Sequence, residues 1–160
     1  MITAIDTNVL LDVLIDDPEF GEKSKKHLEM QGNSGSCIIS PVVYSEMLAF
    51  FLKKHDPKTA FSKAEEFLED MGIQILDFDK EDLALSAQAW QKFSELKQII
   101  CPKCGTTNSF SCRKCNSQIL WRNHIITDFL IGAHARNHAD IFLTRDRGYY
   151  KKYFKLKILQ

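Results

Sequence analysis

The sequence predicts an α/β fold in three layers, in which a mostly parallel central sheet is covered by helices on both faces. Short apolar stretches alternate with longer stretches of helical periodicity, as in strands that are joined through helices by right-handed crossovers. The chain has 160 residues, of which 44% are hydrophobic, so it can bury a core. We therefore predict one domain over residues 1–160, interrupted by a small insertion over residues 100–118.

Short apolar runs rich in β-branched and aromatic residues predict the strands. These runs are bounded by polar or turn-forming residues, and each is too short for a helix. The predicted strands are residues 2–5, 37–39, 73–76, 141–143 and 156–159.

Recognisable ends mark several of the predicted helices. Ser40 followed by Pro41 is a favoured helix start, and Gly72 is a favoured helix end. Asp79 and Asn123 can cap the helices that follow them. The Gly-Asn-Ser-Gly-Ser stretch at residues 32–36 predicts a turn. The predicted helices are residues 9–14, 19–31, 41–54, 58–70, 80–96, 124–137 and 149–153.

The formal net charge of +0 hides an asymmetry along the chain. Residues 1–96 contain 9 Lys and Arg against 18 Asp and Glu, whereas residues 97–160 contain 12 against 3. Many of the acids are expected to lie on solvated helix faces. The basic third indicates a basic surface on one side of the molecule, which suits a polyanionic partner.

Targeting and membrane signals are not found in the sequence. No apolar run reaches the length of about 18 residues that a membrane span needs. The first residues lack the basic region and cleavage site of a signal peptide. We therefore expect a cytoplasmic protein without a membrane partner, in which thiols stay reduced.

Four acidic residues occupy positions that the predicted fold brings together. Asp6 and Asp146 follow two strands, and ligands of an open α/β sheet bind beyond the carboxyl ends of its strands. Glu46 lies on the helix after the second strand, and Asp128 lies among apolar residues of a later helix, where a carboxylate is rarely left without a partner or a metal. Taken singly, Asp6 could only cap a helix, Glu46 could face solvent and Asp146 could belong to a turn.

The segments around these acids resemble, in order, the motif blocks of the PIN-domain nucleases, and most closely those of VapC-like ribonuclease toxins. The four blocks are AIDTNVLLDVL, ISPVVYSEML, ITDFLIGAHA and LTRDRGYYKKYF, and the resemblance covers nearly the whole chain outside the cysteine segment. A PIN-like fold is therefore expected, with a metal-dependent endoribonuclease activity that hydrolyses single-stranded RNA.

This resemblance implies roles for the acids and their neighbours. Asp6, Glu46, Asp128 and Asp146 would be catalytic and would hold Mg²⁺ or Mn²⁺, which would activate water and stabilise the leaving oxygen. Thr7 and Thr144 would bond a carboxylate or a bound water, and Asn8 would brace Asp6. The resemblance also implies an RNA substrate, a possible antitoxin partner and a homodimer.

Four cysteines in two CxxC pairs predict a structural zinc knuckle in the insertion. Cys101 and Cys104 are separated by seven residues from Cys112 and Cys115, and four thiolates can converge on Zn²⁺. Two disulfides are the alternative, mainly in a hyperthermophile. Cys37 lies alone in an apolar strand and is expected in the core.

The knuckle interrupts the minimal PIN pattern, which weakens a simple toxin interpretation. A zinc ribbon also accompanies a PIN domain in a nuclease that matures small-subunit ribosomal RNA, although there it follows the domain. RNA processing is therefore one alternative function, and a non-catalytic RNA- or protein-binding module that uses the knuckle is another. Candidate RNA contacts are the basic residues Arg113, Lys114, Arg122, Arg145, Arg147 and Lys151. His134 and His138 are expected at the surface near a helix end.

Overall fold

The computed structural model describes residues 1–95, 99–100, 106–108, 110–111, 114, 118–119, 125–146 and 149–160. Its centre is a five-stranded sheet in the order β3-β2-β1-β8-β9, and all neighbouring strands in it are parallel. The α/β prediction is confirmed, and the sheet is all-parallel rather than mostly parallel. The strands are β1 (Ile2–Ile5), β2 (Ser36–Ile39), β3 (Ile73–Ile75), β8 (Ile141–Leu143) and β9 (Ile158–Leu159).

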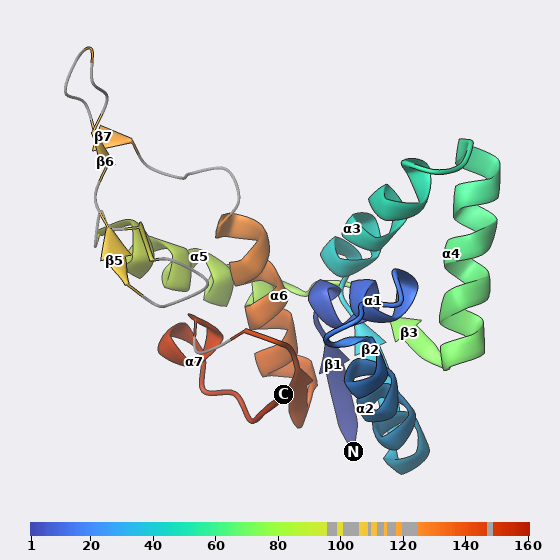
Figure 1. The fold of residues 1–160 in the computed structure, drawn as a ribbon. Coiled ribbons are helices and arrows are strands. Elements are labelled where there is room, and N and C mark those ends of the chain that lie inside the picture. Colours follow the sequence, from blue (N-terminus) through green and yellow to red (C-terminus); the bar gives the residue numbers. More distant parts are fainter. Residues whose placement is uncertain are drawn as a thin grey trace.

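Helices connect the strands and cover the sheet (Figure 1). The first two helices pack against each other, as do α3 with α4 and α5 with α6. In Figure 1, α5 and α6 lie on one side of the sheet and α1 and α2 on the other, while α3 and α4 form a hairpin that projects from the body. The helices are α1 (Thr7–Leu14), α2 (Gly21–Ser34), α3 (Pro41–Leu52), α4 (Pro57–Met71), α5 (Lys80–Glu95), α6 (Ile125–His138) and α7 (Tyr149–Tyr153).

Local capping explains where several helices begin and where α4 ends. The Ser40 hydroxyl accepts a hydrogen bond from the backbone N–H of Val43, and Pro41 is the first residue of α3. Gly72 ends α4 in the left-handed conformation, at φ 62°, which glycine adopts without steric cost. The predicted starts of α3 and α5 and the predicted end of α4 are confirmed.

The predicted turn over residues 32–36 is wrong in its bounds, because α2 continues to Ser34, the chain bends at Gly35 and β2 begins at Ser36. The helix is anchored by Gln31, whose side-chain oxygen accepts a hydrogen bond of 3.0 Å from the buried hydroxyl of Thr3 in β1. This contact with the sheet holds the helix through a stretch of weak helix formers. Such a contact is not visible in a local turn signal.

Two short antiparallel ribbons span the predicted insertion and extend one residue beyond it at each end. Strand β4 (Ile99–Ile100) pairs with β5 (Thr107–Asn108), and β6 (Phe110–Ser111) pairs with β7 (Gln118–Ile119). The four cysteines of the predicted zinc knuckle lie outside the described residues.

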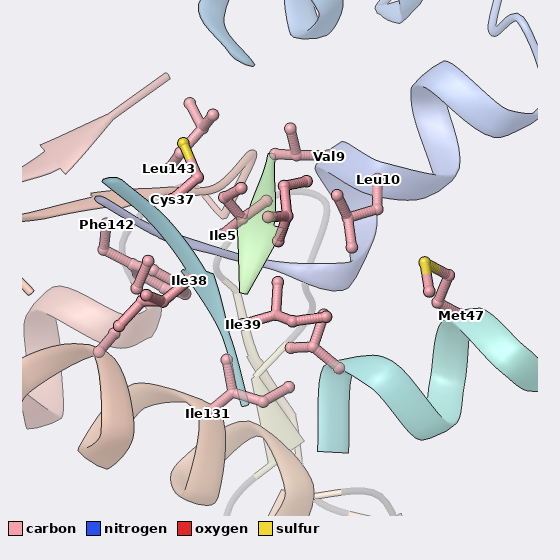
Figure 2. Close-up of a cluster of buried hydrophobic side chains, with 14 of the residues drawn as sticks. Ile5, Val9, Leu10, Cys37, Ile38, Ile39, Met47, Ile131, Phe142 and Leu143 are labelled. Atoms are coloured by element: carbon pink, nitrogen blue, oxygen red, sulfur yellow. The ribbon is translucent and has the colours of Figure 1, made fainter. Parts of the chain in front are cut away.

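The core lies between the sheet and the helices on its two faces (Figure 2). Ile5, Ile39 and Phe142 from three adjacent strands are almost fully buried. Cys37 is buried with them, which confirms its expected place in the core. Among the described helices, none combines the length and the apolar character that crossing a membrane would require.

Candidate active site

The carboxyl ends of β1 and β8 lie side by side and bring two of the predicted acids to one edge of the sheet. Ile5 is the register partner of Leu143, and the backbone N–H of Asp6 donates to the carbonyl of Leu143 at 3.0 Å. Asp6 therefore leaves β1 beside Thr144, which leaves β8. Asp146 follows two residues later.

Asp6 is held in one orientation by three donors. It caps α1 by accepting from the N–H of Thr7 at 2.8 Å. Its other oxygen accepts from the Thr144 hydroxyl at 2.5 Å and from the Asn8 side-chain amide at 2.6 Å. Only 5% of Asp6 is exposed, so these bonds largely determine where its carboxylate lies.

Helix α3 brings Glu46 to the same edge. The Thr7 hydroxyl donates a short hydrogen bond to the carboxylate of Glu46, and this bond links α1 to α3. Helices α1 and α3 also pack against each other. Asp128 enters from the first turn of α6, where it is partly buried.

Asp146 has a second, structural task at this edge. Its side chain accepts from the backbone N–H of Tyr150 at 3.1 Å, at the start of α7, and its own N–H donates to the Thr144 hydroxyl at 3.0 Å. Thr144 thus contacts both Asp6 and the backbone of Asp146. We call the set Asp6, Glu46, Asp128 and Asp146 the carboxyl rim.

The electrostatics show that the rim acids affect one another. Burial raises the pKa of Asp6 to about 6, and repulsion from Glu46 and Asp146 adds to this, while hydrogen bonds from Thr144 and Thr7 oppose it. Burial also raises the pKa of Asp128 to about 7, helped by repulsion from the other three acids. The structure thus brings together all four acids, each of which could by itself have been structural.

Tyr150 belongs to the surroundings of the rim, although the sequence analysis did not single it out. Its side chain is buried, and burial followed by the charges of all four rim acids raises the pKa of its phenol well above the ordinary value. The phenol therefore stays neutral beside the acids. A tyrosine four residues after a rim acid, at the start of a helix, was the available signal.

A second carboxylate cluster lies at the opposite end of α6. In the described part of the chain, Asp79, Asp82 and His138 are the only His, Cys, Asp or Glu residues that bring three ligand atoms within 4.8 Å of one another. No three rim acids are that close. Asp79 and Asp82 cap each other's backbone N–H groups at the start of α5, with distances of 2.8 and 3.1 Å.

Hydrogen bonds satisfy this second cluster. Asp82 is fully buried, and its two oxygens accept from the Asn137 amide at 2.8 Å and from His138 Nε2 at 2.9 Å. Asp79 Oδ2 also lies 3.5 Å from His138 Nε2. We call Asp79, Asp82, Asn137 and His138 the α5–α6 clasp, and we interpret it as structural, because every buried oxygen has a donor.

The surface assignment of the two histidines is therefore wrong for His134 and incomplete for His138. His134 is only 1% exposed, and its Nε2 lies 2.9 Å from the carbonyl of Leu76. Its pKa is lowered by burial, which favours the neutral ring. Helix α6 is covered by α5 along this face, so the polar residues near its end are enclosed.

The structure describes three of the six candidate RNA contacts, namely Lys114, Arg145 and Lys151. Lys114 and Lys151 are exposed. Arg145 is partly buried, and its guanidinium pairs with Asp12, which the sequence analysis did not single out. An acid inside the apolar run of α1 was the signal for Asp12. Arg113, Arg122 and Arg147 lie outside the described residues.

Comparison with known proteins identifies the family of the chain. The sequence model of a family described as "PIN domain" matches residues 3–155. No curated protein sequence matches the chain.

Solved structures with the same fold cover almost the whole chain. One is the structure of VapBC2 from Rickettsia felis bound to a DNA fragment from the VapBC2 promoter. It has a TM-score of 0.67 and 19% sequence identity, and the match covers 99% of this chain and 98% of that chain. VapBC-1 from nontypeable Haemophilus influenzae also has 0.67, at 13% identity over 100% and 98%. VapC20 from Mycobacterium tuberculosis, described as a sarcin-ricin loop cleaving toxin, has 0.52, at 12% identity over 94% and 93%.

Proposed function

Because the chain belongs to the PIN-domain family, we propose that it is a metal-dependent endoribonuclease that hydrolyses phosphodiester bonds of single-stranded RNA. The carboxyl rim is the observation that carries this proposal. The four acids, which follow β1, lie on α3 and α6 and follow β8, are close enough to interact: burial raises the pKa of Asp128 to about 7, and repulsion from the other three acids adds to this. Three of the rim acids accept hydrogen bonds, so what distinguishes the rim is the repulsion that the other three acids add to the burial of Asp128.

The rim residues fit Mg²⁺ or Mn²⁺. Carboxylate oxygens are the hard ligands that these ions prefer, and mutual repulsion among the acids is relieved by a cation. The acids are spread more widely than a closed cage, which suits Mg²⁺, because this ion is usually bound through one or two carboxylates, waters and substrate phosphates. When bound, the ion would activate water and stabilise charge on the scissile phosphate.

The chain's own residues would orient the acids for this chemistry. Thr144 and Asn8 hold one oxygen of Asp6, and Thr7 holds Glu46 against α1. Hydrogen-bonded ligands lose little freedom when an ion binds, and loss of such supporting partners typically costs about 10–100-fold in metal affinity or activity. Exposed Lys151, close to the rim in sequence, is a candidate for phosphate contact.

A toxin-type role is the form of this activity that we favour over RNA maturation. The solved structures that share the fold include VapBC complexes and one toxin that cleaves the sarcin-ricin loop. We accordingly propose a small antitoxin partner and a homodimer. If this role holds, expression of the wild-type chain slows growth of a bacterial host and expression of the Asp6→Asn variant does not.

We further propose one structural Zn²⁺ per chain, held by Cys101, Cys104, Cys112 and Cys115. Each CxxC pair occupies the connection between two antiparallel strands, β4 to β5 or β6 to β7, which is how zinc ribbons present their thiolates. Elemental analysis of protein purified without a metal-affinity tag checks this. Zinc near zero, with thiols that do not react under denaturing conditions, would indicate disulfides.

The endoribonuclease proposal is tested by cleavage of a single-stranded RNA by the purified chain. We expect cleavage with Mg²⁺ or Mn²⁺, none in chelator, and a loss of at least about a hundredfold in Asp6→Asn, because this change removes a ligand itself and not only a supporting partner. Asp70→Asn is the matched control, since Asp70 is an exposed acid on α4. Wild-type cleavage by Asp6→Asn would contradict the proposed site. RNA binding without any cleavage would favour the non-catalytic module.

A further inference from the structure

Arg145 lies between Thr144, which contacts Asp6, and the rim acid Asp146, in the segment that joins β8 to α7. Its guanidinium is engaged with the first two helices. Arg145 Nη2 lies 2.9 Å from Asp12 Oδ1 in α1, and the guanidinium carbon lies 4.4 Å from the ring centroid of Phe20, directly before α2. The Arg145 side chain therefore links the segment after β8 to two positions near the start of the chain.

Asp12 is the charged partner of Arg145 in this contact. It is only 1% exposed, and its other oxygen accepts a hydrogen bond of 2.7 Å from Ser24 in α2. A buried carboxylate needs a counter-charge, and within the described residues Arg145 forms its one ion pair. Neither Asp12 Oδ1 nor Arg145 Nε takes part in a hydrogen bond. The two side chains are therefore held together by the attraction of their charges and not by hydrogen-bond geometry.

The backbone of Arg145 connects this ion pair to the rim. Its N–H donates to Asn8 Oδ1 at 3.1 Å, and the amide of the same Asn8 donates to Asp6 at 2.6 Å. On the other side of Arg145, Asp146 follows directly in the chain and its N–H bonds to Thr144. A shift of the Arg145 backbone would therefore move Asp146 and release the Asn8 side chain that orients Asp6.

We propose that Arg145 is a positioning residue, whose ion pair with buried Asp12 and contact with Phe20 hold the Thr144–Asp146 segment so that Asp6 and Asp146 face the same ion. This role rests on the proposed function and replaces the expectation that Arg145 contacts RNA. The guanidinium is suited to it, because its planar group can lie over an aromatic ring while it pairs with a carboxylate, whereas a lysine ammonium is a compact point charge.

The two roles of Arg145 are separated by changing its partner, which RNA cannot reach. If Arg145 positions the rim, then Asp12→Asn, Arg145→Gln and the double variant all lower kcat by about 10–100-fold and raise the Mn²⁺ concentration for half-maximal activity, with KM for RNA nearly unchanged. The double variant is then no worse than the poorer single variant. Arg145→Lys should recover only part of kcat.

Contact with RNA predicts a different pattern. Arg145→Gln would then raise KM and weaken the salt dependence of RNA binding, while Asp12→Asn would keep wild-type kcat and Mn²⁺ requirement. That outcome overturns the proposal. Arg136→Gln, which changes an exposed arginine at the end of α6, controls for loss of a positive charge. Leu28→Ala in α2 controls for loss of stability, since its kcat below the melting temperature should stay near the wild-type value.

Failure of the proposed function can be recognised separately. If the wild-type chain binds Mn²⁺ but does not cut RNA, the nuclease proposal fails, and the positioning role is read from Mn²⁺ affinity by calorimetry. Weaker Mn²⁺ binding in Asp12→Asn and Arg145→Gln, but not in Arg136→Gln, then supports positioning. Unchanged Mn²⁺ affinity in both variants, or no Mn²⁺ binding by the wild-type chain, overturns it.

Discussion

The carboxyl rim and the α5–α6 clasp gather acidic side chains at the two ends of α6 and treat them in opposite ways. In the clasp, buried Asp82 has a donor for each oxygen, from Asn137 and His138. At the rim, burial and mutual repulsion raise the pKa of Asp6 to about 6 and that of Asp128 to about 7. The carboxylate of Asp82 is paired through hydrogen bonds, whereas the raised pKa values show that the charged forms of Asp6 and Asp128 are disfavoured.

The pairing of the acids distinguishes a structural cluster from a candidate functional site more clearly than the distance between the acids does. The closest packed set of potential ligand atoms in the described residues is the clasp, yet its hydrogen bonds leave no need for an ion. The rim acids are spread more widely, but their charges oppose one another. Groups whose pKa values are strongly perturbed by burial and like charges mark functional sites more often than satisfied clusters do.

The largest effect on stability is expected from breaking the clasp. Asp82→Ala should lower the free energy of unfolding by about 3 kcal/mol, because removing one partner of a buried charged group leaves His138 and Asn137 without their acceptor. Urea unfolding measures this change, and Glu81→Ala, at an exposed neighbouring position, is the control. RNA cleavage well below the melting temperature should stay near wild type. A large loss of kcat in folded Asp82→Ala would show that the clasp is not merely structural.

The opposite sign is expected at the rim. Asp128→Asn should raise the free energy of unfolding in chelator at pH 8 by roughly 2 kcal/mol, because it removes a partly buried charge that the other rim acids repel. This figure is well below the full pKa shift, since Asp128 is partly exposed and solvent screens it. Saturating Mn²⁺ should abolish or reverse the gain. If Asp128→Asn is destabilised in chelator, an attractive partner holds Asp128 in the folded protein.

Per pH unit, the effect expected from pH alone is the smallest of the three. Asp6 and Asp128 have higher pKa values folded than unfolded, so the folded state binds more protons between about pH 4 and pH 7. Their contribution to stability is present below pH 4 and is lost as the pH rises to about 7, with a slope of roughly 1 kcal/mol per pH unit.

Comparison of variants isolates this pH effect from other groups. Burial lowers the pKa of His134, so His134 acts in the opposite direction as the pH falls below its ordinary value. The measurement is therefore the difference between wild type and Asp128→Asn in urea unfolding from pH 4 to pH 8 in chelator. The wild type should lose more stability than the variant across this range. Equal slopes would contradict the raised pKa of Asp128.

Much of the fold and of the rim could be predicted from the sequence because the signals are local. Apolar runs located the strands of the main sheet, and Ser40, Pro41 and Gly72 located helix ends through their own backbone preferences. The four acids could be proposed as one site because they follow strands or lie on helices whose ends meet at one edge of a parallel sheet. Their catalytic role stays a prediction.

Only the tertiary structure decided which polar groups have partners. The length of α2 depends on Gln31 meeting Thr3, and the burial of His134 depends on α5 and on the carbonyl of Leu76. Arg145 meets Asp12 across 133 positions of the chain. The sequence by itself determined the elements and the order of the acids, since these follow from neighbours along the chain. The structure decided that Asp82 meets Asn137 and His138 in the clasp and that the rim acids repel one another, because only folding brings these residues close.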